Sequence, residues 1–218
     1  GALNQIKMVK NPKPYAQKFE IRNLAANAQV WTGKGTKAEK QYTCDPKLFD
    51  ENVNSCAIRI TYGNFRYFNG GDLSGGAQKD LYKAKDRDME TPVAKVCGKV
   101  DVAKANHHGY YDTCNGFFLN TVSPDVMIID ARSQNHPVPP TMARMVDHMV
   151  WPGKGEFYIT VDQPRQKLGE ELWSHFKPWG HIVVRVYEGG EEYQVFVLDA
   201  DSLDYHVIYT SEVKKTGN

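Results

Sequence analysis

The sequence predicts a mixed α/β (α+β) protein that ends in an all-β extension. Residues 56–62 alternate apolar and polar side chains with a period of two, which is typical of a strand with one buried face. Residues 125–131 form a near-continuous apolar run, as expected of a strand buried on both faces. From Gly180 onward only strand-like segments and turns follow. Strands and helices therefore alternate first, and antiparallel strands come last.

The composition is that of a globular protein of one domain, or of one domain with a smaller second part. Hydrophobic residues make up 41% and charged residues 24% of the 218 residues, and the net charge is +1. The pI of 7.8 lies below the value of about 9 that marks a dedicated nucleic-acid domain. No apolar run approaches the roughly 18 residues of a membrane span. We therefore expect neither a strong nucleic-acid patch nor a membrane span in this chain.

The start of the chain is predicted to be a lead-in. Residues 1–18 are rich in Lys, Asn and Pro, and they begin without Met and without a signal-peptide pattern. We therefore expect a truncated chain. The compartment stays open, with export after removal of a signal segment as one alternative.

The cysteines do not decide the compartment either. Cys44, Cys56, Cys97 and Cys114 lack the paired spacing of a zinc ribbon. Buried or free thiols are the favoured interpretation, and one or two disulfides in an exported protein are the alternative.

The first half of the fold is predicted as strands around one hairpin. A strand is expected within residues 19–31, and the polar residues 33–54 predict a loop with a short helix. Residues 56–62 and 65–68 flank the turn Gly63-Asn64, and this arrangement predicts a β-hairpin.

The middle of the chain is predicted to alternate between helices and strands. Helices are expected over residues 77–85 and 116–122, and strands over residues 101–105, 125–131 and 156–161.

A further helix is predicted between the last two of these strands. From Met142 to Val150, apolar residues recur at positions i, i+3, i+4, i+7 and i+8, which is the spacing of one helix face. Thr141 follows two prolines and is the predicted N-cap. We interpret the methionines of this stripe as core residues and not as part of a cofactor site.

Residues 180–218 are predicted to form an antiparallel meander outside the main domain. Its strands are expected over residues 181–187, 193–198 and 205–209, with Gly189-Gly190 as the first turn.

Three polar clusters each follow the end of a predicted strand. They are Gly71-Asp72, His107-His108-Gly109 and Asn135-His136-Pro137. In open α/β sheets, sites form at the carboxyl ends of the strands, so these clusters are expected to converge. Carboxylate and imidazole suit zinc, manganese or iron, and such a metal lowers the pKa of bound water to about 7.

Each cluster also has a structural interpretation. Gly-Gly-Asp is commonly a turn, because Gly and Asp tolerate left-handed backbone. His-His-Gly suits a polar loop with one capping imidazole, and Asn-His-Pro suits a turn before a helix. Their joint spacing is what favours a site. The sequence gives no companions to His148, His175 and His206, which we interpret as surface or satisfied residues.

At these residues the sequence resembles a known family. Residues 54–63 and 68–73, then 100–109, then Pro124-Asp125 and Asn135-His136-Pro137, are similar to the second half of a metallo-β-lactamase fold. The nearest subgroup is the hydrolase domain of the competence protein ComEC and its soluble relatives. The resemblance covers roughly residues 50–150. It implies that residues 19–179 form about half of a four-layer αββα sandwich.

The resemblance assigns roles by position. Asp72 matches the carboxylate that bridges two metals, and His108 matches a late metal ligand. His107 would be an alternate ligand or lie just behind the metal ligands, and His136 would contact the substrate or its leaving group. Asp130 would orient a neighbour, or would be a satisfied structural carboxylate. The implied cofactor of an intact parent is zinc or manganese.

One departure from the family is decisive for activity. The early HxHxDH loop that supplies most first-metal ligands is absent, and no His precedes Asp72. The chain is therefore expected to be either the C-terminal half of a longer protein or a member that has lost its metal site. We expect it to be inactive alone, and to expose an apolar patch that favours a homo-oligomer.

Two functions from different classes follow. The first is a metal-dependent hydrolase whose activated water attacks an ester, a phosphodiester among the candidates. The alternative is a catalytically inactive or fragmentary domain that acts as a binding or scaffold module. A nucleic-acid-binding module is disfavoured by the balanced charge.

Overall fold

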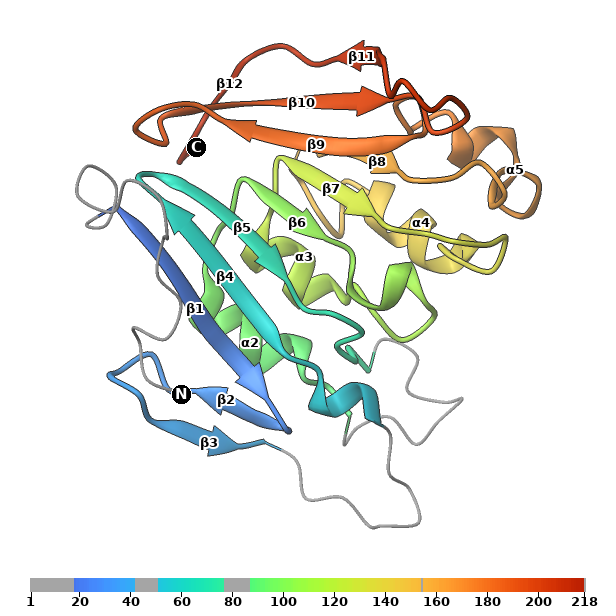
Figure 1. Cartoon of the computed structure of the whole chain (residues 1–218). Helices are drawn as coiled ribbons and strands as arrows, with labels where there is room; N and C mark the ends of the chain where they lie inside the picture. The colour runs from blue at the N-terminus through green and yellow to red at the C-terminus, as the bar shows by residue number, and fades with distance from the viewer. Residues whose placement is uncertain (1–17, 42–50, 77–86, 154, 218) are drawn as a thin grey trace.

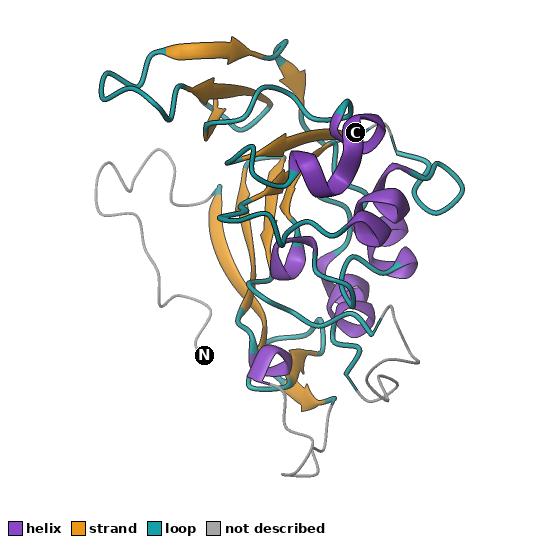
Figure 2. Cartoon of the chain, turned by 90° about the vertical axis from the view of Figure 1, so that its right-hand side faces the viewer, coloured by secondary structure: helices purple, strands orange, loops and turns teal. Residues whose placement is uncertain are grey.

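The structure is a computed structural model that describes residues 18–41, 51–76, 87–153 and 155–217. In this part of the chain, a large mixed sheet carries helices on one face, and a smaller antiparallel sheet packs on the other (Figures 1 and 2). The predicted α+β class is confirmed.

The large sheet has eight strands in the order β3-β2-β1-β4-β5-β6-β7-β8. The strands from β3 to β5 are antiparallel, whereas β5, β6, β7 and β8 are parallel neighbours. Their bounds are β1 Phe19–Ala26, β2 Gln29–Trp31, β3 Ala38–Lys40, β4 Ala57–Tyr62, β5 Phe65–Asn69, β6 Val102–Lys104, β7 Val126–Ile129 and β8 Glu156–Ile159.

Helices cover one face of this sheet because the connections between its parallel strands run along that face (Figure 2). Phe68 of β5 meets Phe118 of α3 with ring centroids 5.3 Å apart. Met127 and Met142 are fully buried in the same core. The α-helices are α2 Glu90–Cys97, α3 Gly116–Val122, α4 Pro139–Val146 and α5 Arg165–Trp173, and the 3-10 helices are η2 Glu51–Asn54 and η4 Asn106–Gly109.

The smaller sheet forms a second core with the opposite face of the large sheet. Alternate residues of β10, Tyr193, Val195 and Val197, are buried, and they pack with Phe65 and Tyr158. The predicted antiparallel meander is confirmed, with one added strand. Its strands are β9 His181–Val186, β10 Glu192–Leu198, β11 Val207–Thr210 and β12 Lys214–Lys215. The other three strands all pair with β10.

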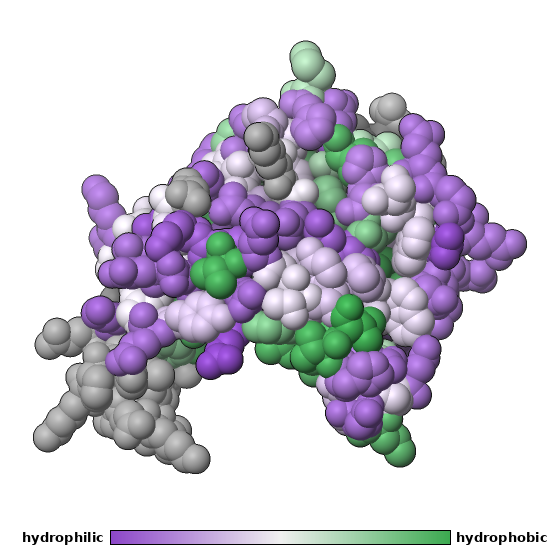
Figure 3. All heavy atoms as spheres, turned by 90° about the horizontal axis from the view of Figure 1, so that it is seen from above, coloured by the Kyte–Doolittle hydropathy of each residue, from purple (hydrophilic) through white to green (hydrophobic). Residues whose placement is uncertain are grey.

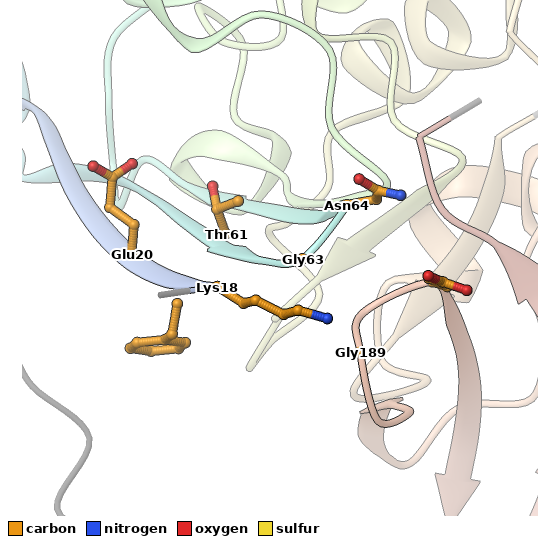
Figure 4. A pocket seen from close by; sticks show the side chains of 8 residues that line it. Lys18, Glu20, Thr61, Gly63, Asn64 and Gly189 are labelled. Atoms are coloured by element: carbon orange, nitrogen blue, oxygen red, sulfur yellow. The ribbon is translucent and has the colours of Figure 1, made fainter. Parts of the chain in front are cut away.

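Two hairpin turns, Gly63-Asn64 of the large sheet and Gly189-Gly190 of the smaller sheet, contact each other and join the sheets. The Phe65 N–H donates to the Gly190 carbonyl at 3.0 Å, and the Gly189 N–H donates to the Tyr62 hydroxyl at 3.2 Å. Figure 4 shows Gly63 facing the turn that holds Gly189, beside an open pocket of about 510 Å³. The two turns approach so closely that a Cβ at Gly190 would lie 1.8 Å from the Tyr62 carbonyl oxygen.

Several elements follow the sequence prediction closely. The β4–β5 hairpin, helix α3 and strands β6, β7 and β8 lie where the pattern places them, each within a few residues. The short helix predicted within residues 33–54 is η2. The helix predicted over residues 77–85 lies outside the described residues.

The predicted N-cap of helix α4 is wrong. The helix begins at Pro139 with Val138 as N-cap, because prolines fit the first helical positions, where their missing N–H is not needed. Thr141 lies inside the helix, and its hydroxyl donates to the Tyr110 carbonyl at 2.8 Å. The helix also ends at Val146, and Met149 is 92% exposed, so the stripe is shorter than predicted.

Local patterning also missed elements near the chain start and around the site. One strand was expected within residues 19–31, and the structure has two, β1 and β2. They are connected by a turn at Asn27 and Ala28, both of which have positive φ. Strand β3 lies in the predicted loop, and its three residues are all exposed, so it carries no alternation. Helices α2 and α5 were not predicted, and α5 contains a left-handed Gly169.

The surface carries exposed apolar side chains on the smaller sheet and the segments beside it. Figure 3 shows apolar groups gathered in patches among hydrophilic residues on this side. Val183, Val207, Ile208 and Val213 are 42%, 52%, 43% and 49% exposed. Self-association through an apolar patch remains a prediction. No helix in the described ranges is long and apolar enough to cross a membrane.

We predict that Gly190→Ala destabilises the protein far more than Gly189→Ala. Both glycines have positive φ, so either alanine costs about 1–2 kcal/mol of backbone strain. Only the Gly190 Cβ meets backbone atoms, which adds about 1–3 kcal/mol of overpacking. Urea unfolding of the two variants measures the difference, and equal losses would contradict the interlocked turns.

Candidate functional site

The three predicted polar clusters converge at one edge of the large sheet. Asp72 follows β5, His108 follows β6 and His136 follows β7. These strands are parallel neighbours, so their carboxyl ends meet at the same edge. The edge lies opposite the Gly63-Asn64 turn, because that turn precedes β5 and the site follows it.

His108 stands between two carboxylates. Its Nε2 lies 3.3 Å from Asp72 Oδ1, so these two clusters converge as expected, and a shared metal centre stays a prediction. Its Nδ1 lies 3.0 Å from Asp130 Oδ1 and 2.9 Å from the Asp130 carbonyl oxygen. This contact is compatible with the orienting role considered for Asp130.

Lys104 adds a cation that the sequence prediction missed. Its ammonium group lies 3.3 Å from Asp130 Oδ1 and donates to the Gly71 and Ala105 carbonyls, each at 3.0 Å. Only 9% of its side chain is exposed. A lysine next to the apolar Val102 and Ala103 of a predicted strand was the available signal, because a buried Lys requires partners.

These contacts shift the protonation of the site. The hydrogen bond to Asp130 raises the pKa of His108 above its ordinary value, against a smaller effect of burial. Burial works to raise the pKa of Asp130, but His108 and Lys104 together outweigh it and lower that pKa. The pair therefore favours an imidazolium beside a carboxylate.

The other two histidines lie against each other at the mouth of a pocket. The rings of His107 and His136 are stacked with centroids 5.9 Å apart, and His136 is 5.6 Å from His108. Burial, helped by the charges of the neighbouring histidines and Lys167, lowers the pKa of His136. The open pocket has a volume of about 500 Å³ and is lined by His107, Tyr110, Tyr111, Asn135, His136, Val138 and Lys167.

The turn that carries His107 and His108 has an unusual backbone. Both residues have positive φ, 44° and 54°, which is uncommon for residues with a Cβ and costs about 1–3 kcal/mol each. The His107 N–H holds the turn to the Asp72 segment by donating to the Gly71 carbonyl at 3.0 Å. A strained turn held in this way is typical of functional sites.

The donor atoms fit part of a metal site. Neighbouring ligands of a tetrahedral zinc lie about 3.3–3.5 Å apart when the bonds are about 2.0–2.2 Å long. Asp72 Oδ1 and His108 Nε2 have this separation, and Asp130 on Nδ1 matches the carboxylate that commonly orients a ligating His. However, within the described ranges no group of three or more His, Cys, Asp or Glu side chains is arranged to hold a metal.

The remaining histidines and cysteines lie outside this cluster. His148, His175 and His206 are exposed, in agreement with the sequence interpretation, and His206 pairs with Asp204 at 3.1 Å. Among the described cysteines, Cys56, Cys97 and Cys114 are free thiols. Cys44 lies outside the described residues.

Fold and site together define an α+β domain with a carboxylate–imidazole cluster at the carboxyl ends of its parallel strands. The chain matches no known family model. Over 155 residues it is 26% identical to competence protein ComA of Neisseria gonorrhoeae, an alignment that covers 68% of this chain and 21% of that protein. The chain thus spans about a fifth of this curated relative. The similarity is distant and gives weak support to a ComEC-like relationship.

We predict that Asp130→Asn weakens the fold most where Asp130 is ionised and His108 is protonated. His108, with its raised pKa, contributes stability that is complete below its ordinary pKa of 6.5 and lost as pH rises through the raised value. Asp130 contributes above its ordinary pKa of 3.8 and loses this as pH falls through its lowered value. The loss should be about 0.2–1 kcal/mol after solvent screening, since the carboxylate is 43% exposed.

Chemical denaturation of the variant and the unmodified protein, at pH values from below 3.8 to above 6.5, measures the effect. The matched control is Asp204→Asn, which removes an exposed carboxylate from His206 and should change stability little. A pH-independent loss in Asp130→Asn would contradict the coupling to His108.

Proposed function

We propose that this chain contributes half of the site of a metal-dependent hydrolase of the metallo-β-lactamase type. Its substrate class would be an ester, with a phosphodiester as the leading candidate. The observation that carries the proposal is the 3.3 Å separation of Asp72 and His108, two donors supplied by neighbouring parallel strands. The distant similarity to a competence protein agrees with this proposal.

In this proposal Asp72 Oδ1 and His108 Nε2 would hold zinc or manganese, which supplies a hydroxide-like water when bound. Asp130 fixes the ring of His108 through Nδ1 and raises its basicity as a ligand. Lys104 holds Asp130 in place and balances its charge. These two donors are fewer than the three that a catalytic zinc takes, so further ligands must come from another segment.

His136 is proposed to act on the substrate. Its lowered pKa keeps the imidazole neutral at pH 7, so it can accept a proton or hydrogen-bond a leaving group. It lies on the pocket wall together with His107, Tyr110 and Lys167, where a bound substrate would contact it. His107 is proposed to support this wall, since its ring packs against both His136 and Tyr110.

The second candidate is an inactive binding or scaffold domain. This candidate is favoured by the two carboxylates around His108. Asp72 and Asp130 together satisfy both ring nitrogens of an imidazolium without any metal. In such a domain the pocket beside His136 would be the binding surface.

We predict that the 218-residue chain binds Zn²⁺ weakly and through Asp72 and His108. Asp72→Ala and His108→Ala should each lower Zn²⁺ affinity by about tenfold or more, whereas His136→Ala should leave it unchanged. Competition with a chromogenic chelator measures the affinities, and Asp201→Asn, an exposed carboxylate, is the control. Loss of Zn²⁺ in His136→Ala equal to that in Asp72→Ala would make the role of His136 wrong.

We also predict that the chain alone hydrolyses no phosphodiester measurably, with or without added Zn²⁺ or Mn²⁺. The reason is that two donors do not assemble a two-metal centre. A chromogenic phosphodiester assay tests this. Robust metal-dependent turnover that Asp72→Ala abolishes would overturn the assignment of half a site.

A further inference from the structure

We propose that Glu90 is a positioning residue that acts through Asn106 to hold the Asp72 turn and the His107-His108 turn in register. The inference rests on the proposed function for its purpose, but its geometry stands independently. Glu90 is the first residue of α2, on the helical layer behind the site, and it is fully buried. Nothing in the chemistry proposed above uses it.

Glu90 gathers hydrogen bonds from two separate segments. Its Oε1 accepts from Asn106 Nδ2 at 2.7 Å and from the Cys114 N–H at 2.6 Å. Its Oε2 accepts from the Asn115 N–H at 2.7 Å. One carboxylate therefore joins the start of α2 to the histidine turn and to the start of α3.

Asn106 connects this carboxylate to the site. It directly precedes His107 and His108, and its side chain is fully buried. On its other side it reaches Gly70, where an added Cβ would lie 2.1 Å from Asn106 Oδ1. Asn106 is thus wedged between Glu90 and the Gly70-Gly71 turn that leads into Asp72.

Glu90 also contacts the segment that follows Asp72. Its backbone N–H donates to the Ser74 carbonyl at 3.2 Å, and a Cβ added at Gly75 would lie 2.1 Å from Glu90 Oε2. The segment before Asp72 therefore packs against Asn106, and the segment after Asp72 packs against Glu90. The separation of Asp72 from His108 is fixed from behind by this arrangement.

The burial of Glu90 indicates that its role exceeds packing. Burial raises the pKa of Glu90 to about 8, against the effect of its three N–H donors. An apolar residue of similar size would fill the space without this desolvation cost. A fully buried carboxyl group with hydrogen bonds to the histidine turn and to the start of α3 is suited to holding those segments at one spacing.

The test uses the 218-residue chain with the variants Asn106→Ala and Glu90→Gln. The matched control is Val93→Ala, a fully buried core position on the same helix. Three quantities are measured for each: Zn²⁺ affinity, thermal midpoint, and hydrogen exchange of the His107 amide, which bonds Gly71. The Ala105 amide, which bonds Ile128, is the internal reference for exchange.

We expect Asn106→Ala and Glu90→Gln to weaken Zn²⁺ binding by about 10-fold or more, the usual effect of losing a group that orients a ligand. Exchange of the His107 amide should accelerate, and that of the Ala105 amide should not. Val93→Ala should lower the thermal midpoint to a similar extent and leave affinity and His107 exchange unchanged.

The outcomes separate this inference from the proposed function. If the unmodified chain binds no Zn²⁺, the metal site is wrong, and His107 exchange alone decides the positioning role. Unchanged His107 exchange in both variants overturns the role of Glu90 and Asn106. Equal effects of Val93→Ala on affinity and exchange would overturn it too, because they would show general destabilisation only.

Discussion

The parallel pairing of β5, β6 and β7 is the constraint on which the rest of the molecule depends. Phe68 of β5 pairs with Ala103 of β6, which pairs with Met127 of β7, so one line of residues crosses the sheet at the same height. Each chain segment then leaves the sheet at one edge, where the polar clusters meet. The helices that connect these strands bury one face of the sheet, and the smaller sheet packs on the opposite face.

The site is held by charges that satisfy one another. Asp130 lies between His108 and Lys104, and Asp72 lies on the far side of His108. This arrangement is a stable ion-pair network without metal, and it also presents two donors at ligand spacing. Because Asp130 engages Nδ1 of His108, a metal at Nε2 would replace only the proton that faces Asp72 and would leave the contact with Asp130 intact. The same four side chains are therefore compatible with both candidate functions.

Much of the fold could be predicted from the sequence because its elements have clear periods. The buried run of β7 and the meander of β9 to β11 report which residues are buried. The alternation of β4 located the strand but not its buried face, because Ala57 is its buried residue and Cys56 is exposed. Elements whose character depends on remote neighbours were missed. Strand β3 is exposed throughout, and the first residue of α2, Glu90, is buried against the start of α3, a segment distant in sequence. The predicted N-cap of α4 was wrong because the helix begins at the prolines before Thr141, whose hydroxyl instead bonds Tyr110, a partner far away in sequence.

The sequence by itself determined which chemistry is present and where along the chain it lies: Asp72, His107, His108 and His136, each just after a strand. Only the tertiary structure decided their partners. Lys104 and Glu90 are charged side chains in buried elements, and their roles depend on which segments fold against them. The strand order brings Asp130 to the back of His108 and Asn106 to Glu90, and these contacts join residues more than ten positions apart. Local periodicity records the side on which a residue is buried, whereas the identity of its partner is set only when the strands take their order in the sheet.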